Sequence, residues 1–308
     1  MKSHKSKKMR KPPALKLGDT IALVRPAGFI SDKILKKTAE NLRSLGFCVV
    51  TYLGKSKKDG FFSASDESRA AELNWAFSQP GISAIFCCRG GYGSVRTFSH
   101  ISKTQIQKWK PKIFVGYSDM TYVHQILQNE MGLVSFHGPL SGFLNKKDLK
   151  VFVQSLLDLP RAQKQKWSEV KIYKKGSARG KLLGGNLSLL QVAGRAALPK
   201  VPMILAIEDV NENFYRIDRM IWTLIDAGYA PFVRGVVLGK FLSCGKDDSK
   251  IFGWSRVMQS LQKLTRGPIW QNANFGHGMK RQRLLALGCE VEMKNRSLIV
   301  RESIVSDF

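Results

Sequence analysis

The sequence predicts an α/β protein in two parts, with a candidate site in the cleft between them. Strand-like and helical runs alternate from residue 20 to about residue 129, which favours a parallel sheet covered by helices, as in Rossmann or flavodoxin-like folds. Beyond residue 181, strand-like runs mix with one helical pattern, which indicates a smaller C-terminal α/β domain with its own sheet. Polar residues and glycine-rich turns follow several strand-like runs, where rigid scaffolds display functional groups.

The elements of the first part follow from short apolar runs and from apolar residues at helical spacing. The expected strands are 20–24, 48–52, 84–88 and 113–115. The expected helices are 34–45, 69–77 and 122–129.

The chain divides into four segments on the same grounds. Residues 1–14 are expected to form a disordered basic tail, and residues 15–145 the N-terminal domain. The charged stretch 146–180 is expected to be a helix and connector, and residues 181–308 the C-terminal domain. The expected elements of the C-terminal domain are strands near 181–183, 203–207 and 235–238 and a helix over 215–227.

A serine lies at a sharp corner of this pattern. The strand-like run that precedes it stops at Gly116, and a helical pattern begins at Met120. Ser118, between them, is expected at the carboxyl edge of the sheet. The amide of Asp119, at the helix N-terminus, would point toward an oxyanion formed beside that serine. The simpler alternative is that Ser118 only caps the helix.

Two residues further along the chain could act with Ser118. Glu208 lies at the end of the buried-type run 202–209, and His277 is flanked by glycines with no apolar periodicity around it. A serine hydroxyl needs a neutral imidazole to accept its proton, and the imidazole needs a carboxylate to hold its tautomer. Each residue also has a non-catalytic interpretation. His277 could be a solvated loop residue, and Glu208 could cap the following helix or form an ion pair. The order Ser, Glu, His is that of α/β-hydrolases, but the second glycine of their G-x-S-x-G elbow is missing, which excludes that family.

A glycine-rich turn, RGGYG at 89–93, follows the expected strand 84–88 and precedes a new helical pattern. Because glycines permit positive φ and close backbone approach, this turn could direct an amide toward a substrate. A phosphate cradle is disfavoured, since the turn lacks both the Lys-Ser/Thr ending of a P-loop and the G-x-G-x-x-G spacing. The alternative interpretation, a tight turn that binds no ligand, remains open.

Several further motifs occur in one order along the chain. They are RAAELNWAF at 69–77, RGGYG at 89–93, VGYSD at 115–119, FHGP at 136–139, LGGNL at 183–187, AIED at 206–209, YRIDR at 215–219 and GHG at 276–278. Together they resemble the serine LD-carboxypeptidases, the murein tetrapeptide carboxypeptidases whose relatives include the microcin self-immunity peptidases. The resemblance extends from Leu17 to about Val291, with one departure, Ala286, where proline is expected. That departure concerns a strand start rather than the chemistry.

The resemblance implies roles for particular residues. Ser118 would be the nucleophile, Glu208 the acid of a catalytic triad and His277 its general base, and the oxyanion hole would come from the amides of Asp119 and Gly91. The implied reaction, through an acyl-enzyme, hydrolyses the amide between an L,D-configured diamino acid residue and the terminal D-alanine of a murein tetrapeptide. No metal or organic cofactor is implied, and relatives suggest a homodimer.

Three residues are weaker candidates for substrate binding. Arg89 begins the glycine-rich turn and could meet the terminal carboxylate of a substrate. Asn186 could contact substrate or cap a helix over 187–193, and the cap is favoured. His137, before Gly138, could line the cleft or occupy a turn.

The composition indicates a reducing compartment and no membrane span. Five cysteines are scattered and odd in number, which favours reduced thiols over a disulfide framework. No segment approaches the roughly 18 unbroken apolar residues of a membrane span, and prolines interrupt the stretch after the basic N-terminus, so no signal peptide is expected. The histidines are dispersed, without H-E-x-x-H or C-x-x-C, which disfavours a metal site. We therefore expect a cytoplasmic protein.

The net charge of +27, from 50 Lys and Arg against 23 Asp and Glu, is not explained by the resemblance. Clustered cations can neutralise nucleic-acid phosphates. The clusters, in the N-terminal tail and in 146–181, have neither interleaved aromatics nor a groove-reading motif, so nucleic-acid binding is disfavoured. A solvated basic surface is favoured, and its field would also attract a peptide that carries several carboxylates.

Three functions follow from these observations. The favoured one is a serine peptidase that releases D-alanine from murein peptides during peptidoglycan recycling. The first alternative is a related serine peptidase that cleaves aminoacyl-nucleotide antibiotics, since the same triad would serve both. The alternative from another class is a nucleic-acid-binding protein on an inactive peptidase scaffold.

Overall fold

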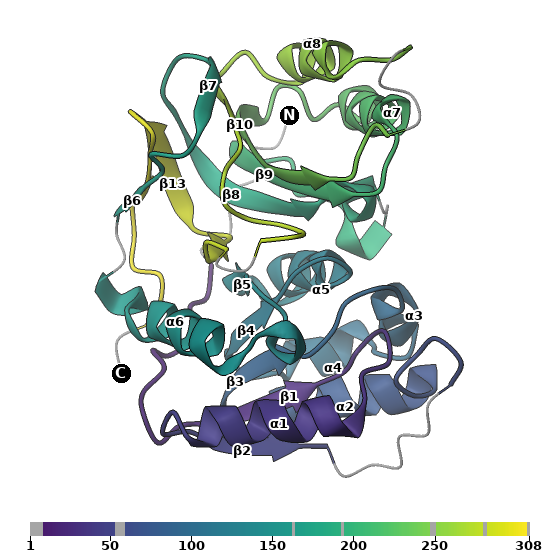
Figure 1. Cartoon of the computed structure of the whole chain (residues 1–308), viewed down its shortest axis with the longest axis vertical. Helices are drawn as coiled ribbons and strands as arrows, with labels where there is room; N and C mark the ends of the chain where they lie inside the picture. The colour runs from purple at the N-terminus through teal and green to yellow at the C-terminus, as the bar shows by residue number, and fades with distance from the viewer. Residues whose placement is uncertain are drawn as a thin grey trace.

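The computed structural model has two parts, the first in the lower and the second in the upper half of Figure 1. It describes residues 9–52, 59–161, 164–191, 194–246, 251–279 and 282–306. Residues 1–8 of the predicted tail lie outside this set. The prediction of disorder is wrong for residues 9–14. Arg10 forms an isolated β-bridge with Leu133, and Pro13 forms one with Ser306. The Lys11 ammonium lies 2.7 Å from the Glu302 carboxylate.

The first sheet has the strand order β12-β5-β4-β3-β1-β2. Five strands run parallel: β1 (Thr20–Val24), β2 (Cys48–Thr51), β3 (Ile82–Cys87), β4 (Ile113–Gly116) and β5 (Ser135–His137). The sixth, β12 (Leu285–Leu287), comes from far along the chain and pairs antiparallel with β5. The order 2-1-3-4-5 is that of flavodoxin-like folds, which confirms the predicted fold class.

Helices cover both faces of this sheet (Figure 1). They are α1 (Asp32–Arg43), α2 (Asp66–Ser78), α3 (Ser94–Ser99), α4 (Lys103–Gln107), α5 (Met120–Ile126) and α6 (Lys146–Leu157). The side-chain oxygens of Ser31, Ser65, Ser102 and Asn145 accept backbone N–H groups that the first turns of α1, α2, α4 and α6 leave unpaired. The predicted helix 122–129 is α5 followed by a π-helical turn, Leu127–Met131.

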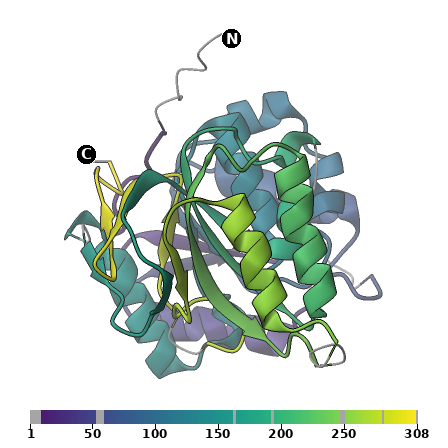
Figure 2. The same ribbon diagram turned by 90° about the horizontal axis from the view of Figure 1, so that it is seen from above.

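The second sheet has the strand order β6-β14-β13-β8-β9-β10-β11-β7. The central strands β8 (Ala178–Asn186), β9 (Met203–Val210), β10 (Val233–Leu242) and β11 (Ile269–Gln271) are parallel. The flanking strands β6 (Lys164–Lys166), β7 (Lys171–Lys174), β13 (Glu290–Lys294) and β14 (Ser297–Val300) pair antiparallel. Helices α7 (Phe214–Asp226) and α8 (Trp254–Leu264) lie side by side over one face (Figure 2). Short 3₁₀ turns occupy Ser141–Phe143, Leu159–Arg161, Leu187–Gln191 and Gly194–Ala196.

One prediction about the second part is wrong, and it concerns the segment between the two domains. The sheet of the second part has eight strands against six in the first. The predicted connector 146–180 contributes α6 and also strands β6 and β7, which form the two edges of the second sheet. Lysine-rich edge strands avoid pairing with other chains, and the same lysines made this stretch resemble a solvated connector.

The two parts share a hydrophobic core. One buried cluster contains Val115 and Phe136 of the first sheet together with Ala206 and Trp270 of the second. A second cluster fills the other face of the first sheet, and a third lies beneath α7 and α8. The boundary between the parts is therefore packed rather than open. Within the described residues, no helix is both long and apolar enough to cross a bilayer.

Candidate active site

Ser118 follows strand β4 in a tight turn before helix α5. Its φ is +62°, a left-handed conformation that is uncommon for serine and costs about 1–3 kcal/mol. The turn is close-packed, because a Cβ placed on Gly90 would lie 3.1 Å from Ser118 Cβ and one on Gly116 would lie 2.6 Å from Met120 Cγ. The prediction of a strand-to-helix corner is confirmed. The N-cap residue of α5 is Asp119 rather than Ser118, and its side chain makes no capping hydrogen bond.

His277 links Ser118 to Glu208. Its Nε2 lies 3.2 Å from Ser118 Oγ, and its Nδ1 lies 2.7 Å from Glu208 Oε2. The same carboxylate oxygen accepts the backbone N–H of His277 at 3.1 Å. The imidazole is therefore fixed with Nδ1–H toward the carboxylate and Nε2 as the acceptor for the serine proton.

Each of the three residues comes from a different element. Glu208 lies on β9 and is fully buried, whereas the His277 side chain, in the loop after β11, keeps 18% of its surface exposed. The loop owes its path to glycines, since Gly276 has a φ of +99° and Gly278 a φ of +76°. A Cβ on Gly276 would lie 2.7 Å from Glu208 Oε2, so no other residue fits there without moving the carboxylate.

Gly276→Ala is expected to lower kcat/KM by about 100-fold, the loss typical of a reacting group displaced by about 1 Å. The added methyl pushes His277 from Glu208, and an alanine at this position cannot adopt the positive φ without strain. Steady-state kinetics on the purified variant measures this. Gly81→Ala, where a Cβ would meet nothing within 4 Å, should remain as active as the wild type, and equal activity of both variants would contradict the assigned geometry.

Asp119 directly follows Ser118 in the chain, and Gly90, the neighbour of Gly91, packs against Ser118. Within the described chain, no hydrogen bond uses the backbone N–H of Asp119 or of Gly91 as its donor. Their segments are joined through Ser94 at the start of α3, whose backbone N–H donates to Asp119 Oδ2 at 2.8 Å and whose Oγ donates to the Asp119 carbonyl at 2.9 Å. Burial raises the pKa of the Asp119 carboxyl, against these hydrogen bonds. The assignment of these two amides to an oxyanion hole stays a prediction.

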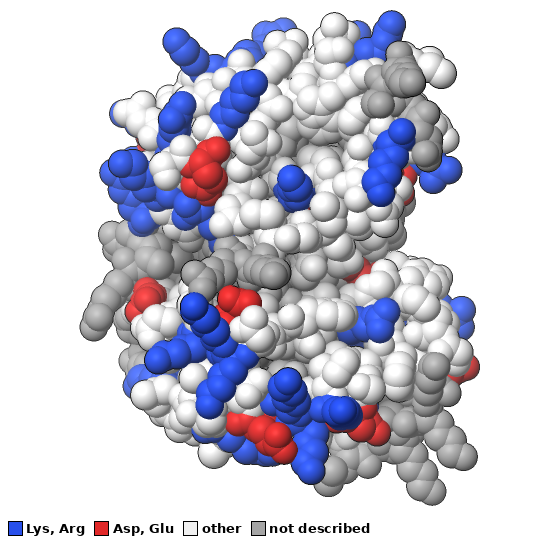
Figure 3. All heavy atoms as spheres, in the orientation of Figure 1, with Lys and Arg blue, Asp and Glu red and all other residues white. Residues whose placement is uncertain are grey.

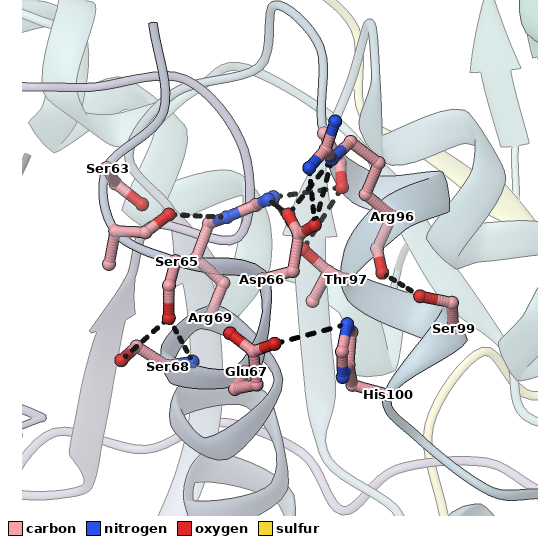
Figure 4. A network of polar contacts seen from close by, with 12 residues as sticks. Ser63, Ser65, Asp66, Glu67, Ser68, Arg69, Arg96, Thr97, Ser99 and His100 are labelled. Carbon is pink, nitrogen blue, oxygen red and sulfur yellow. Dashed lines mark hydrogen bonds and ion pairs between the residues drawn. The ribbon is translucent and has the colours of Figure 1, made fainter. Parts of the chain in front are cut away.

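Buried Arg69 of α2 holds the glycine-rich turn in place. Its guanidinium donates to the carbonyls of Pro26 at 3.0 Å, Gly93 at 2.9 Å and Ala64 at 3.1 Å. Arg69 and exposed Arg96 both reach the carboxylate of Asp66 (Figure 4). One side chain thus ties the turn to the segments after β1 and before α2, and the position of Gly91 depends on it.

Tyr117 packs against His277, one of the catalytic candidates. Its ring centre lies 4.9 Å from that of His277 in an edge-to-face arrangement. Burial, and then the charge of Glu208, raise the pKa of the Tyr117 phenol to about 12, so it stays protonated near neutral pH. The aromatic ring shields one side of the imidazole from water.

Of the three weaker candidates, Arg89 keeps its predicted place beside the glycine-rich turn, while Asn186 and His137 have other surroundings than predicted. Arg89 donates to the Phe29 carbonyl at 2.6 Å and remains half-buried beside the glycine-rich turn. Asn186 does not cap the following turn. Its Nδ2 donates to Asp209 Oδ1 at 3.0 Å, and its backbone N–H donates to Thr121 Oγ1 at 2.9 Å, while Asp209 Oδ2 accepts the N–H of Ser188. Asn186 therefore links the second sheet to helix α5, next to Ser118.

His137 lies in strand β5 and is fully buried, so the prediction that it lines the cleft or occupies a turn is wrong. Its backbone pairs with Leu285 of β12, and its ring contacts the rings of Tyr117 and Phe275. Burial, and then nearby His124 and His277, lower the pKa of His137 to about 3. Burial likewise lowers the pKa of His124 to about 4, against its hydrogen bond to the Gly116 carbonyl.

The lowered pKa values of His124 and His137 lead us to expect that mild acid reduces the stability of the fold. Both stay neutral in the folded protein, while an unfolded histidine takes up a proton near pH 6.5, so stability is lost as the pH falls from about 6.5 toward 4. At pH 5 each contributes a loss of up to about 2 kcal/mol. His137→Phe should shrink the difference in unfolding free energy between pH 7 and pH 5, measured with urea, by about that amount. An unchanged difference in His137→Phe would refute this origin.

The sequence did not single out Tyr117, Arg69 or Ser94. Arg69 and Tyr117 lie within the motifs that carried the family resemblance, and that was the available signal. Ser94 follows the glycine-rich turn directly, but its contact with Asp119 depends on strand order. Cys88, just before the glycine-rich turn, is fully buried, and burial raises the pKa of its thiol to about 12, so it is poorly suited to act as a nucleophile. Among the described residues, no three His, Cys, Asp or Glu side chains are grouped to hold a metal ion.

The fold and these contacts define the arrangement of a serine hydrolase, in which a hydroxyl, an imidazole and a carboxylate are joined in sequence beside two backbone amides. Models of the LD-carboxypeptidase N-terminal and C-terminal domains match residues 21–138 and 179–293. The chain belongs to the LD-carboxypeptidase family and is an enzyme of its serine type. The resemblance inferred from the motifs is confirmed.

Curated relatives and solved structures agree with this family. A probable murein peptide carboxypeptidase of Bacillus subtilis is 34% identical over 244 residues, 76% of each chain. The murein tetrapeptide carboxypeptidase of Pseudomonas aeruginosa is 27% identical over 84% of this chain and 88% of its own length. A muramoyltetrapeptide carboxypeptidase from Oxalobacter formigenes superposes with a TM-score of 0.79 at 26% identity, covering 92% of this chain and 99% of the other. The microcin C7 self immunity protein MccF superposes with a TM-score of 0.83 at 22% identity, covering 96% of this chain and 99% of the other, and shows the shared fold.

Proposed function

We propose that this enzyme hydrolyses the amide that joins the L centre of a diamino acid residue to the terminal D-alanine of murein tetrapeptides. The observation that carries the proposal is the continuous contact from Ser118 through His277 to Glu208, in a chain of the LD-carboxypeptidase family. The curated relatives of Bacillus subtilis and Pseudomonas aeruginosa are named for murein peptides, which supports this substrate class.

The proposed reaction has two halves. Ser118 Oγ attacks the scissile carbonyl carbon as His277 Nε2 takes its proton, and the oxyanion accepts the N–H groups of Asp119 and Gly91. The imidazolium, stabilised by Glu208, then gives the proton to the leaving nitrogen, and D-alanine departs from the acyl-enzyme. Water, deprotonated by His277, attacks the ester and regenerates the serine. Arg89 beside the turn is proposed to meet the carboxylate of the D-alanine.

The test is incubation of the purified enzyme with murein tetrapeptide, followed by mass spectrometry of the tripeptide and free D-alanine. Release by the wild type and not by Ser118→Ala supports the proposal. Absence of release from a folded sample rejects it and directs the test to an aminoacyl-nucleotide substrate, since MccF was solved with glutamyl sulfamoyl guanosine.

Nucleic-acid binding is the weaker alternative. Lys and Arg are scattered over the visible face of both parts in Figure 3, whereas binding to a nucleic-acid backbone favours one continuous stripe. We further propose a cytoplasmic, recycling role and a homodimer. The buried, unreactive thiols of Cys87, Cys88 and Cys289 are compatible with a reducing compartment.

A further inference from the structure

A groove leads from the candidate active site along helix α6, which lies to the left of Figure 1. Its inner half has a volume of about 380 Å³ and its outer half about 460 Å³. Both halves are lined by Pro139, Asp148 and Gln282, so they form one continuous depression, which we call the α6 groove. One wall is α6 and the segment before it, and the other is the loop after β11.

The inner end of the α6 groove adjoins the reacting groups. Tyr117 lines it, precedes Ser118 in the chain and contacts the His277 ring. Gly278 and Met279, which directly follow His277, line the opposite wall. A substrate whose scissile carbonyl lies at Ser118 can therefore extend one of its two ends into this groove.

The size of the groove indicates which end enters it. The leaving group of the proposed reaction is one D-alanine, which needs room for a single small residue. The acyl side of a tetrapeptide carries three residues. A depression of two linked halves, each of several hundred Å³, matches the longer acyl side.

The lining also suits a peptide. The lining combines amide and hydroxyl side chains, among them Asn145, Ser155 and Gln282, with apolar Phe152 and Leu284 and with the charged Asp148, Asp158 and Arg283. Amides and hydroxyls pair with peptide N–H and C=O groups, while the apolar surface accepts short side chains.

Gln282 connects the groove to the catalytic loop. Its Oε1 accepts the N–H of Gly276 at 3.3 Å, one residue before His277. Within the described chain, no hydrogen bond uses its Nε2 as donor, and Gln282 lines both halves of the groove. A peptide carbonyl that binds Nε2 would hold the Gln282 side chain against the segment that positions the general base.

We propose that the α6 groove binds the two residues of the substrate that precede the diamino acid, and that this contact makes the enzyme selective for chains longer than a dipeptide. The inference rests on the proposed function. Contacts remote from the scissile bond raise the rate when their binding energy holds the reacting carbonyl in place.

The experiment compares two substrates, murein tetrapeptide and the dipeptide of its diamino acid with D-alanine. For the wild type, kcat/KM for the tetrapeptide should exceed that for the dipeptide by about tenfold or more, the sum of a few hydrogen bonds. Equal values for both substrates would overturn the proposal.

A groove-filling variant locates the effect. Ser155 is exposed on α6 and lines only the outer half, so Ser155→Trp should fill that half without disturbing Ser118. It should bring kcat/KM for the tetrapeptide down to near the dipeptide value and leave the dipeptide unaffected. Gln154→Trp, exposed on the same helix but outside the lining, is the matched control and should change neither.

The remaining outcomes also decide the matter. Equal losses for both substrates in Ser155→Trp, or equal losses in Ser155→Trp and Gln154→Trp, would show that the groove has no role in selectivity. D-alanine release without length dependence would overturn the subsite and leave the proposed function standing. No release from either substrate would overturn the proposed function and the subsite with it.

Discussion

Ser118→Ala is expected to lower kcat/KM for D-alanine release by at least about 10³-fold, because the reaction loses its nucleophile while binding and the two amides remain. In the described chain the only hydrogen-bond partner of Ser118 Oγ is His277. Removal of the hydroxyl therefore breaks no other hydrogen bond of the described residues and should not destabilise the fold. Ser99→Ala, which removes an exposed hydroxyl on α3, should retain full activity.

A stability measurement separates catalysis from folding at this position. Ser118 has a φ of +62°, which glycine adopts without steric cost. Ser118→Gly should therefore be as inactive as Ser118→Ala and at least as stable as the wild type in thermal unfolding. A variant at position 118 that keeps its activity would exclude Ser118 as the nucleophile.

Glu208→Gln is expected to lower kcat by about 10³-fold or more with little change in KM. Glu208 Oε2 accepts both the Nδ1–H and the backbone N–H of His277, and its negative charge stabilises the imidazolium that forms as the serine proton is transferred. An amide keeps the shape but supplies no charge, and if its NH₂ group faces Nδ1 the imidazole takes the wrong tautomer.

The unfolding free energy distinguishes this role from a structural one. Glu208 is fully buried, and replacing a buried carboxylate by a neutral amide removes a desolvation cost, so stability should not fall. Glu212→Gln, which removes a nearby carboxylate paired with Arg216, should leave kcat unchanged. Full activity of Glu208→Gln would remove Glu208 from the proposed triad, and strong destabilisation would indicate a packing role.

The sequence predicted those features that depend on local patterns. The strand before Ser118 and the strand that carries Glu208 are apolar runs with clear ends, and the glycines around His277 mark a loop, so the sequence alone singles out these residues. Strand β1 was predicted with its observed bounds for the same reason.

Features that depend on distant pairing could not be predicted in this way. Strand β12 is three residues long, and nothing in its sequence shows that it joins the first sheet rather than the second. The burial of His137 and the contact of Asn186 with Thr121 follow from that pairing and from the packing of the two sheets. The same holds for the α6 groove, whose walls come together only in the folded chain.

The pairing of β12 with β5 has a consequence for how the chain is made. Synthesis proceeds from the N-terminus, so β1 to β5 emerge from the ribosome long before residues 285–287. Until then the outer edge of β5 presents unpaired backbone groups beside His137, and Lys11 and Pro13 lack their partners Glu302 and Ser306. The nascent first half therefore carries an open β-edge that only the last part of the protein can close, and its protection during translation depends on how quickly the rest of the chain follows.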